Sequence, residues 1–242
     1  MEFETIETYM TFDELGGIKE ILPRTRNDAH KLIEECMLLA NVAAAEYSLE
    51  HDIPMLYRVH EAPEFSRIQK VRDFVKLLGL PFPEQPTQAD YQAVIEATKD
   101  RLDAPSIHAV LLRSMMQAYY GANNAGHYGL AYEAYTHFTS PIRRYPDLLL
   151  HRAIKAYLDK KAYPLSGAAL DDAGEHFSQT ERRADEASRS VTTWLKCHYM
   201  QQHLGDEFVG IISAVTEFGL FVTLKDLYVD GMIHVSQLGE DF

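Results

Sequence analysis

The stretch HFTSPIRRYPDLLLHR, from His137 to Arg152, sets two adjacent arginines and two histidines at the start of an apolar helical run. Thr139 or Ser140 can cap a helix there, and Pro141 suits the first helical position because an N–H at that position would find no partner in the helix. Pro146 follows one turn later and must kink or interrupt the helix. The stretch therefore predicts a helix that starts at Pro141 and bends at Pro146.

In that helix Arg143 and Arg144 fall in the first turn, beside the positive end of the helix dipole. Cations there oppose the dipole at a cost of roughly a few tenths of a kcal/mol per charge, which a bound polyanion would relieve. A guanidinium is also a planar, bidentate clamp for phosphate oxygens. Pairing of the arginines with acidic neighbours is the alternative, and the spacing alone favours neither.

The composition is that of a globular protein with one substantial domain and a second, smaller one: the chain has 242 residues, of which 46% are hydrophobic. The longest apolar stretch, around 37–45, is shorter than the roughly 20 residues that a membrane span needs. No secretory signal pattern precedes it, so we expect a cytoplasmic protein with no membrane partner. Cys36 and Cys197 have no metal-ligand spacing and are expected to be buried.

The charge balance argues against long-range attraction to nucleic acid, because 36 acidic and 23 basic residues give a net charge of −13. RNA binding would therefore need a local basic groove. Arg143, Arg144 and Arg152 can line such a groove, and Arg58 with His60 can add to it.

Most of the chain has helical periodicity. The first 12 residues alternate like an edge strand, and MLYRVH (55–60) is typical of a buried extended passage. The apolar stripe of the first helix runs from Ile33 to Tyr47, and in the helix after Arg144 Leu150, Ile154, Tyr157 and Leu158 mark the buried side. The predicted helices begin near Asn27, cover about 66–78, 89–99, 105–120 and 141–158, and end with a long helix over 170–204.

From Gly205 the pattern changes to short β runs, EFVGIISAV, GLFVTL and GMIHVS, separated by turn residues. They are typical of the first three strands of a five-stranded OB barrel. Because three strands cannot close a barrel, we expect this segment to be marginally stable and mobile or to lean on the helical part. The fold class is therefore α+β, mostly helical over 1–204, with a partial β-barrel over 205–242.

The motifs also resemble a known family. HFTSPIRRYPDLLLHR is similar to the signature of the ribonuclease II and ribonuclease R family of 3′-to-5′ exoribonucleases, which share the RNB catalytic domain. The resemblance continues through RNDAHKLIEECMLLAN, GHYGLAYEAY, ERRADEASRSVTTWLKC and an S1-like segment from Gly205, and so spans essentially the whole chain. LIEECMLLAN and RRYPDLLLHRAIK favour the ribonuclease R branch.

The resemblance implies roles for several side chains. Arg143 matches the arginine that stabilises charge on the scissile phosphate, while Arg144 either serves the same groove or holds the helix by pairing with a carboxylate. One glutamate of the pair Glu34 and Glu35 is expected to accept from the ribose 2′-hydroxyl, and Glu35 is the favoured one. Weaker RNA-binding candidates, each of which can instead be structural, are Arg58, His60, His127 and Tyr135.

In the S1-like segment Phe218, Phe221 and His234 resemble RNA-stacking residues. Aromatic rings on an OB surface stack with any base and contribute roughly 1–3 kcal/mol each. Strand alternation makes one of the two phenylalanines a core residue.

The sequence departs from the family at the metal site. The family hydrolyses RNA to nucleoside 5′-monophosphates with Mg²⁺ held by closely spaced aspartates upstream of the helix near Asn27, and this cluster is absent here. We therefore expect no metal ligands in this chain and no activity from the chain alone. A non-catalytic RNA-binding or regulatory module is the alternative. The expected partner is the single-stranded 3′ end of RNA and the expected state a monomer; whether ribosomal or trans-translation factors are partners stays open.

Overall fold

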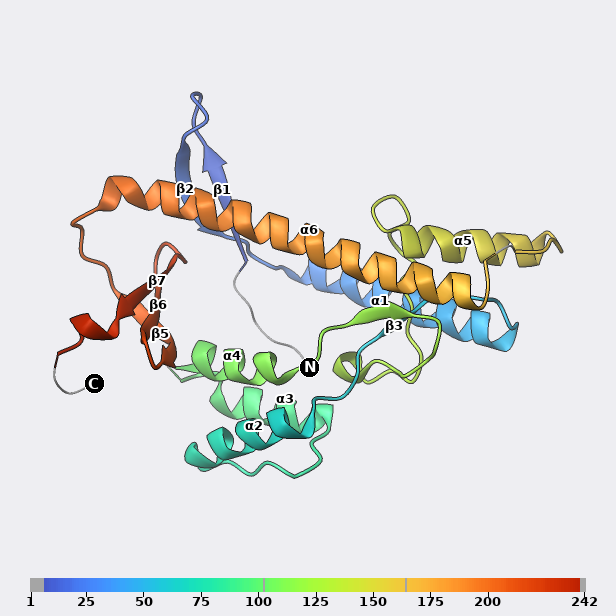
Figure 1. Cartoon of the computed structure of the whole chain (residues 1–242), viewed down its shortest axis with the longest axis horizontal. Coiled ribbons are helices and arrows are strands. Elements are labelled where there is room, and N and C mark those ends of the chain that lie inside the picture. Colours follow the sequence, from blue (N-terminus) through green and yellow to red (C-terminus); the bar gives the residue numbers. More distant parts are fainter. Residues whose placement is uncertain (1–6, 102, 164, 240–242) are drawn as a thin grey trace.

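The computed structural model describes residues 7–101, 103–163 and 165–239 and has the α+β character expected from the sequence. Two short antiparallel sheets and three helical groups precede a small three-stranded sheet (Figure 1). The elements are β1 (Thr8–Phe12), β2 (Ile18–Pro23), α1 (Asp28–Glu50), β3 (Tyr57–Val59), α2 (Phe65–Leu77), α3 (Gln88–Thr98), α4 (Ala104–Ser114), β4 (Tyr119–Gly121), η1 (Tyr128–Leu130), α5 (Tyr145–Leu158), α6 (Ala168–Met200), η2 (Gln201–His203), β5 (Gly210–Thr216), β6 (Gly219–Leu224), β7 (Asp230–His234) and η3 (Val235–Gln237).

The predicted first strand forms over its described part, where β1 pairs antiparallel with β2. Residues 1–6 of that prediction lie outside the described residues. The β1–β2 hairpin leads directly into α1, which Asn27 caps by accepting a hydrogen bond from the backbone N–H of His30 at 3.0 Å. The predicted helix start near Asn27 is therefore confirmed.

The predicted core stripe of α1 is correct only in its second half. Ala44 is buried, whereas the side chain of Ile33 is 59% exposed. The segments that cover the C-terminal half of α1 do not reach its N-terminal half. Among the described residues of α1, none before Asn41 is buried. For the same reason Cys36 is exposed; Cys197 is exposed on α6, so the expectation that both cysteines are buried is wrong.

Helices α2, α3 and α4 pack into one group around a core of their own, which includes Val71, Val75, Tyr91, Ile107 and Leu111. The predicted helix over 105–120 is too long at its C-terminal end. Helix α4 ends at Ser114, where Met115 turns to extended backbone, and Tyr119–Gly121 instead forms β4 against β3. β-Pairing at this point wins over helical periodicity because it buries Tyr120.

Helix α5 starts at Tyr145, so the predicted start at Pro141 is wrong. Residues 141–143 form a turn, Arg144 occupies the N-cap position, and Pro146 lies within the first turn. Proline is tolerated there because its missing N–H has no partner in the helix, so no kink results. Leu150 is buried as expected, but Tyr157 and Leu158 are exposed near the outer end of the helix.

Helix α6 crosses the molecule and connects its two ends (Figure 1). It docks on β4 at Gly174, where a Cβ would lie 2.7 Å from the Tyr120 carbonyl oxygen. Ser178, one turn later, accepts a hydrogen bond from the Tyr120 N–H at 2.8 Å. Glycine and serine at this spacing let the helix approach the strand closely.

The three predicted β runs of the C-terminal segment are confirmed as the antiparallel sheet β5–β6–β7. The sheet touches the helical part through Ser106, whose hydroxyl donates to the Ile212 carbonyl at 2.7 Å, and through Lys196, whose ammonium donates to the Tyr228 carbonyl. No described helix is both long and apolar enough to cross a membrane.

Candidate functional site

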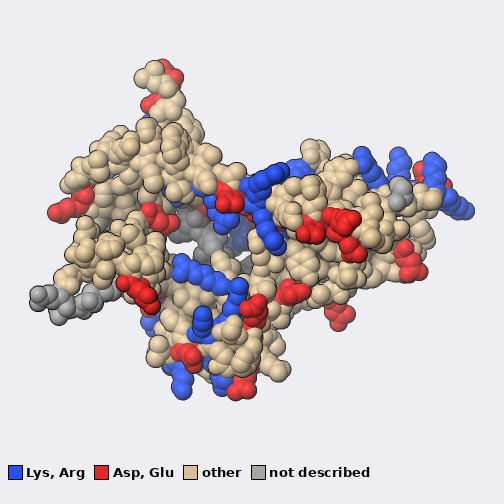
Figure 2. All heavy atoms as spheres, in the orientation of Figure 1, with Lys and Arg blue, Asp and Glu red and all other residues tan. Residues whose placement is uncertain are grey.

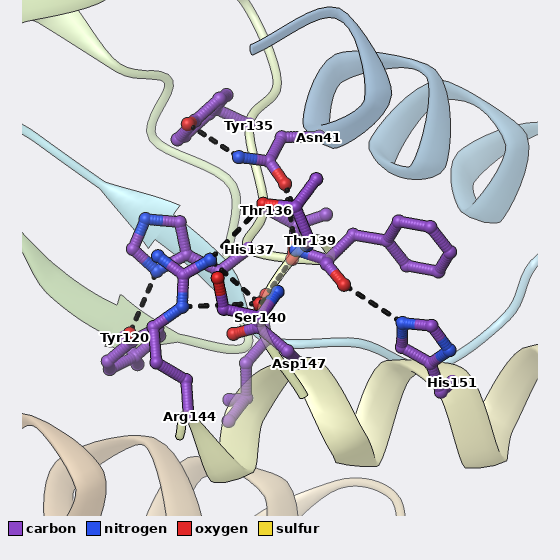
Figure 3. A network of polar contacts seen from close by, with 12 residues as sticks. Asn41, Tyr120, Tyr135, Thr136, His137, Thr139, Ser140, Arg144, Asp147 and His151 are labelled. Carbon is purple, nitrogen blue, oxygen red and sulfur yellow. Dashed lines mark hydrogen bonds and ion pairs between the residues drawn. The ribbon is translucent and has the colours of Figure 1, made fainter. Parts of the chain in front are cut away.

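Asp147 organises the start of α5. Its side chain is fully buried, and Oδ1 accepts hydrogen bonds from the Ser140 N–H at 2.8 Å and from the Arg144 guanidinium at 2.8 and 3.2 Å (Figure 3). A carboxylate in the first turn also interacts favourably with the helix dipole. Arg144 is thus turned inward, with 17% of its side chain exposed. Of the two roles predicted for Arg144, the geometry matches the one that holds the helix.

Arg143, in contrast to Arg144, is exposed. It ends the exposed turn before α5, whose backbone is closed by hydrogen bonds from the Arg143 and Arg144 N–H groups to the Ser140 carbonyl at 3.3 and 3.0 Å. Within the described part of the chain its guanidinium has no hydrogen bond or ion pair. Arg143 is therefore the arginine of the pair that can take a phosphate.

Asn41, which sequence reasoning did not select, fixes the chain just before this turn. It is buried in the middle of α1, and its Oδ1 accepts from the N–H groups of Phe138 and Thr139 at 2.9 and 3.2 Å. Its amide nitrogen donates to the Tyr135 hydroxyl at 2.9 Å. A polar residue on the inner face of an otherwise apolar helix was the signal for this role.

His137 and Tyr120 form a buried polar pair in the centre of the network, with 2.8 Å between the tyrosine oxygen and His137 Nδ1 (Figure 3). Burial, followed by the charges of Arg144 and Arg58, lowers the pKa of His137 to about 2. Burial raises the pKa of Tyr120 to about 12. Both groups are neutral near pH 7, and the arginines create a positive local field in a chain whose net charge is −13.

Arg58 joins this network from β3. Its guanidinium pairs with Glu181 of α6 at 2.6 Å and lies 4.7 Å from the centroid of the Tyr120 ring. Its backbone N–H donates to the Tyr135 carbonyl at 2.8 Å. The predicted basic groove residue is thus largely committed to contacts inside the protein, with 16% of its side chain exposed.

His60 and His127 stack on each other, with ring centroids 5.1 Å apart. Each accepts a backbone hydrogen bond at Nδ1, from Gly129 at 3.0 Å and from Leu130 at 3.1 Å. Burial lowers the pKa of both rings, that of His127 to about 4 with help from His60. The two rings hold the loop around η1, and they also line a hollow of about 330 Å³.

Tyr135 packs edge-on against His127 and His137, at 5.1 and 5.8 Å between ring centroids. It is buried, and burial raises the pKa of its hydroxyl, which the bond from Asn41 partly offsets. The structure therefore brings Tyr135 together with Arg58, His60, His127 and Arg144, and their predicted RNA contacts stay predictions. Tyr135 itself lies buried beneath these residues.

The glutamate pair on α1 is divided by a local contact. Glu34 pairs with Arg26, whose Nε lies 3.1 Å from Oε1. Glu35 is exposed and has no partner among the described residues. It precedes Asn41 by six residues, or roughly 9 Å along the helix axis at about 1.5 Å per residue. This division favours Glu35 as the residue free to meet a ligand.

The three candidates in the C-terminal sheet lie apart from this network, beyond the other end of α6 (Figure 1). Phe218 is 51% exposed in the turn before β6, and its ring meets that of Phe221 edge-on at 5.9 Å. Phe221 is half-buried, so neither phenylalanine is a fully buried core residue in this structure. His234 lies at the exposed end of β7, and its Nδ1 accepts from the Ser236 N–H at 3.2 Å.

The described residues contain no group of three or more His, Cys, Asp or Glu side chains that could hold a metal ion. Asp147 has one buried oxygen, Oδ2, without a protein partner, but its other oxygen is taken by Arg144 and no second carboxylate joins it. A metal site does not form from the residues seen here, and the guanidinium of Arg143 is the cation of this network that has no protein partner among them.

Two family models match the chain: the RNB domain over residues 1–160 and the S1 RNA binding domain over 201–241. Ribonuclease R of Vibrio parahaemolyticus is 50% identical over the whole chain, and ribonuclease R of Escherichia coli is 46% identical. The chain spans 31% of the length of each of these relatives.

A solved structure agrees. Mycoplasma genitalium RNase R in complex with ribose-methylated single-stranded RNA superposes with a TM-score of 0.89 at 27% identity, over 99% of this chain and 39% of that one. The resemblance predicted from the motifs, including the preference for ribonuclease R, is confirmed. The chain belongs to the RNB family.

Proposed function

We propose that this chain forms the RNA-gripping part of a 3′-to-5′ exoribonuclease that hydrolyses RNA to nucleoside 5′-monophosphates. The observation that carries the proposal is Arg143, an unpaired guanidinium on a turn that Asp147 and Asn41 brace from both sides. Relatives named ribonuclease R and an RNase R structure bound to single-stranded RNA support the assignment.

In this proposal Arg143 stabilises the charge that develops on the scissile phosphate. A donor that is already in place needs no reorganisation when that charge forms. Arg144 acts as a positioning residue, because its guanidinium binds Asp147 and keeps the turn in place. Glu35 accepts from a ribose 2′-hydroxyl and so favours RNA over DNA.

The complete enzyme is proposed to require Mg²⁺. The residues described here do not fit such an ion, because Asp147 is a lone buried carboxylate already paired with Arg144. We therefore expect that the chain by itself binds RNA without hydrolysing it. We propose that the protein is a monomer in the cytoplasm. Contacts with ribosomal or trans-translation factors are predictions that need separate tests.

The first experiment follows a 5′-labelled single-stranded RNA with the purified chain, by anisotropy for binding and on a gel for shortening, with Mg²⁺ or with EDTA. Salt-dependent binding with intact RNA is expected. Mg²⁺-dependent 3′ shortening would show that a metal site exists in the chain. Absence of binding even at low salt would overturn the proposed function.

The second experiment tests Arg143 within a complete enzyme. Vibrio parahaemolyticus ribonuclease R is rebuilt with this chain in place of the matching 31% of its length. Arg143→Ala should lower kcat by roughly a hundredfold to a thousandfold, the usual effect of removing one transition-state donor, with RNA affinity modestly changed. Arg113→Ala, which removes an exposed arginine from α4, serves as the control. Collapsed affinity with normal kcat at saturation would assign Arg143 to binding alone.

A further inference from the structure

The exposed middle of α6 carries a second set of RNA-compatible side chains, outside the network around Asp147. A groove of about 640 Å³ lies between this part of the helix and the segment that joins α4 to β4. Its lining combines two arginines, one glutamate and three uncharged polar side chains with one large aromatic ring. The lining residues are Gln117, Arg182, Glu186, Arg189, Ser190, Thr193 and Trp194.

These residues share one face of the helix. Positions 182, 186, 189, 190 and 193 recur at the three- and four-residue spacings that bring side chains together along a helix. Arg182 and Arg189 are exposed, and within the described residues neither guanidinium has a hydrogen bond or ion pair. Glu186 lies between them, four residues after one and three before the other. The groove thus presents two available cations in a chain with a net charge of −13.

Trp194 is the aromatic residue of the groove. Its side chain is 65% exposed, an unusual position for the chain's single tryptophan, and its ring stacks with that of His198 at 5.6 Å. An exposed indole beside arginines is typical of surfaces on which the bases of single strands stack while the backbone follows the positive charge.

The position of the groove connects the two parts of the molecule already assigned to RNA. At one end of the groove, Glu181 pairs with Arg58, which belongs to the network around Asp147. At the other end, Lys196 donates to the Tyr228 carbonyl of the S1-like segment. Positions 182 and 194 are separated by roughly 18 Å at about 1.5 Å per residue, the length of about five stacked nucleotides. Figure 2 shows Lys and Arg side chains on both sides of the central hollow that α6 borders.

We propose that this groove is a binding subsite for single-stranded RNA, in which Arg182 and Arg189 contact phosphates and a base stacks on Trp194. RNA is the occupant that the position of the groove favours, because its two arginines lie on the helix that joins the network around Asp147 to the S1-like segment. The inference rests on the proposed function, since it places the path of the same RNA between the S1-like segment and Arg143.

The experiment uses the full chain and a single-stranded oligoadenylate. Trp194 is the chain's single tryptophan, so its fluorescence reports on this groove alone, while a labelled RNA reports total binding by anisotropy. Saturable quenching that parallels the anisotropy curve is expected. The double variant Arg182→Ala/Arg189→Ala should weaken binding at least about tenfold and lower the salt slope by about 1.4, from roughly 0.7 per phosphate contact on a single strand.

Two controls separate the groove from general charge. Arg183→Ala removes an exposed arginine from the same helix turn but outside the groove, and should change the affinity less than about twofold. Trp194→Ala should weaken binding at least about fivefold, as expected for the loss of one stacking platform, whereas Val191→Ala should not.

Each outcome decides between the groove and other sites. RNA binding by anisotropy without a change in tryptophan fluorescence would overturn the groove and leave the proposed function standing. Equal losses from Arg183→Ala and from each groove arginine would also overturn it, because binding would then follow net charge. Absence of RNA binding in both assays would overturn the proposed function itself.

Discussion

A single carboxylate separates the roles of Arg143 and Arg144, which stand side by side in the sequence. Asp147 lies three residues after Arg144, within reach of its guanidinium, and burial makes that pairing obligatory. A buried charge left without its partner typically costs about 3–5 kcal/mol. Among the described residues, the guanidinium of Arg143 has no hydrogen bond or ion pair and stays available, although Asp147 lies four residues after it. The sequence contains this signal in the Arg144–Asp147 spacing, but spacing does not show which of the two arginines turns inward.

The lowered pKa values of His137 and His127 predict how the stability of the fold depends on pH. Their pKa values are lowered to about 2 and about 4, so the folded state resists protonation while the unfolded chain, with an ordinary pKa of 6.5, accepts protons. Stability is therefore complete above about pH 6.5 and falls as the pH decreases, by up to about 1.4 kcal/mol per pH unit for each histidine. The His127 contribution ends near pH 4.

The measurement is the free energy of unfolding in urea between about pH 7.5 and 5. His137→Gln removes one titrating group, so its curve should be flatter than that of the unmodified chain by up to about 1.4 kcal/mol per pH unit, whatever its stability at pH 7.5. Ala187→Gln, at an exposed and non-titrating position on α6, should leave the slope unchanged. Parallel curves for all three proteins would show that His137 titrates normally in the folded state.

At the scale of elements, the contact of α6 with β4 depends on Gly174. Replacement of a helical glycine by alanine normally stabilises a helix by about 1 kcal/mol. Here the added Cβ would meet the Tyr120 carbonyl oxygen at 2.7 Å and Leu56 Cδ2 at 3.1 Å, so the strand or the helix must move. We expect Gly174→Ala to destabilise the protein by about 1–3 kcal/mol, measured by urea unfolding.

Ala187→Gly is the matched control, because it makes the reverse exchange at an exposed position on the same helix. It should destabilise by about 1 kcal/mol through helix propensity alone. A stabilising effect of Gly174→Ala would mean that the helix and strand have more room than the structure gives them.

Elements set by local signals could be predicted from the sequence, and elements set by distant contacts could not. The Asn27 cap, the long α6 and the three C-terminal strands follow from patterns within each segment. The end of α4 depends on β4 pairing with β3, some 60 residues earlier in the chain. The true start of α5 depends on Asn41 and Asp147 fixing the extended segment before it.

The candidate site divides in the same way. The resemblance directed attention to Arg143, Arg144 and Glu35, whereas Asn41, Tyr120 and Glu181 emerged only once segments distant in sequence were placed together. The signal for Asn41 was a polar residue in apolar surroundings, which shows that a partner is needed without naming it.

Across the whole molecule, the S1-like sheet is held less firmly than the rest. Among its described residues only Gly219, Leu220 and Val229 are buried, and every residue of β7 is exposed. Its tethers to the helices include the hydrogen bonds of Ser106 and Lys196. A sheet with so small a core should open locally without global unfolding, so its amides should exchange at least about tenfold faster than those of α5 around Leu150.

Hydrogen exchange followed by mass spectrometry tests this directly, and a variant shows whether the tethers matter. Ser106→Ala/Lys196→Met should speed exchange in β5–β7 further and leave α5 unchanged, because the removed bonds join the sheet to α4 and α6. The control Ser188→Ala/Lys155→Met changes exposed residues elsewhere and should have no effect on the sheet.

Exchange over 206–236 as slow as in α5 would show that the sheet is a stable part of one cooperative unit, and the RNA path over α6 would then end on a rigid surface. Fast exchange that slows when RNA is added would show instead that RNA bridging α6 and the sheet orders the S1-like segment.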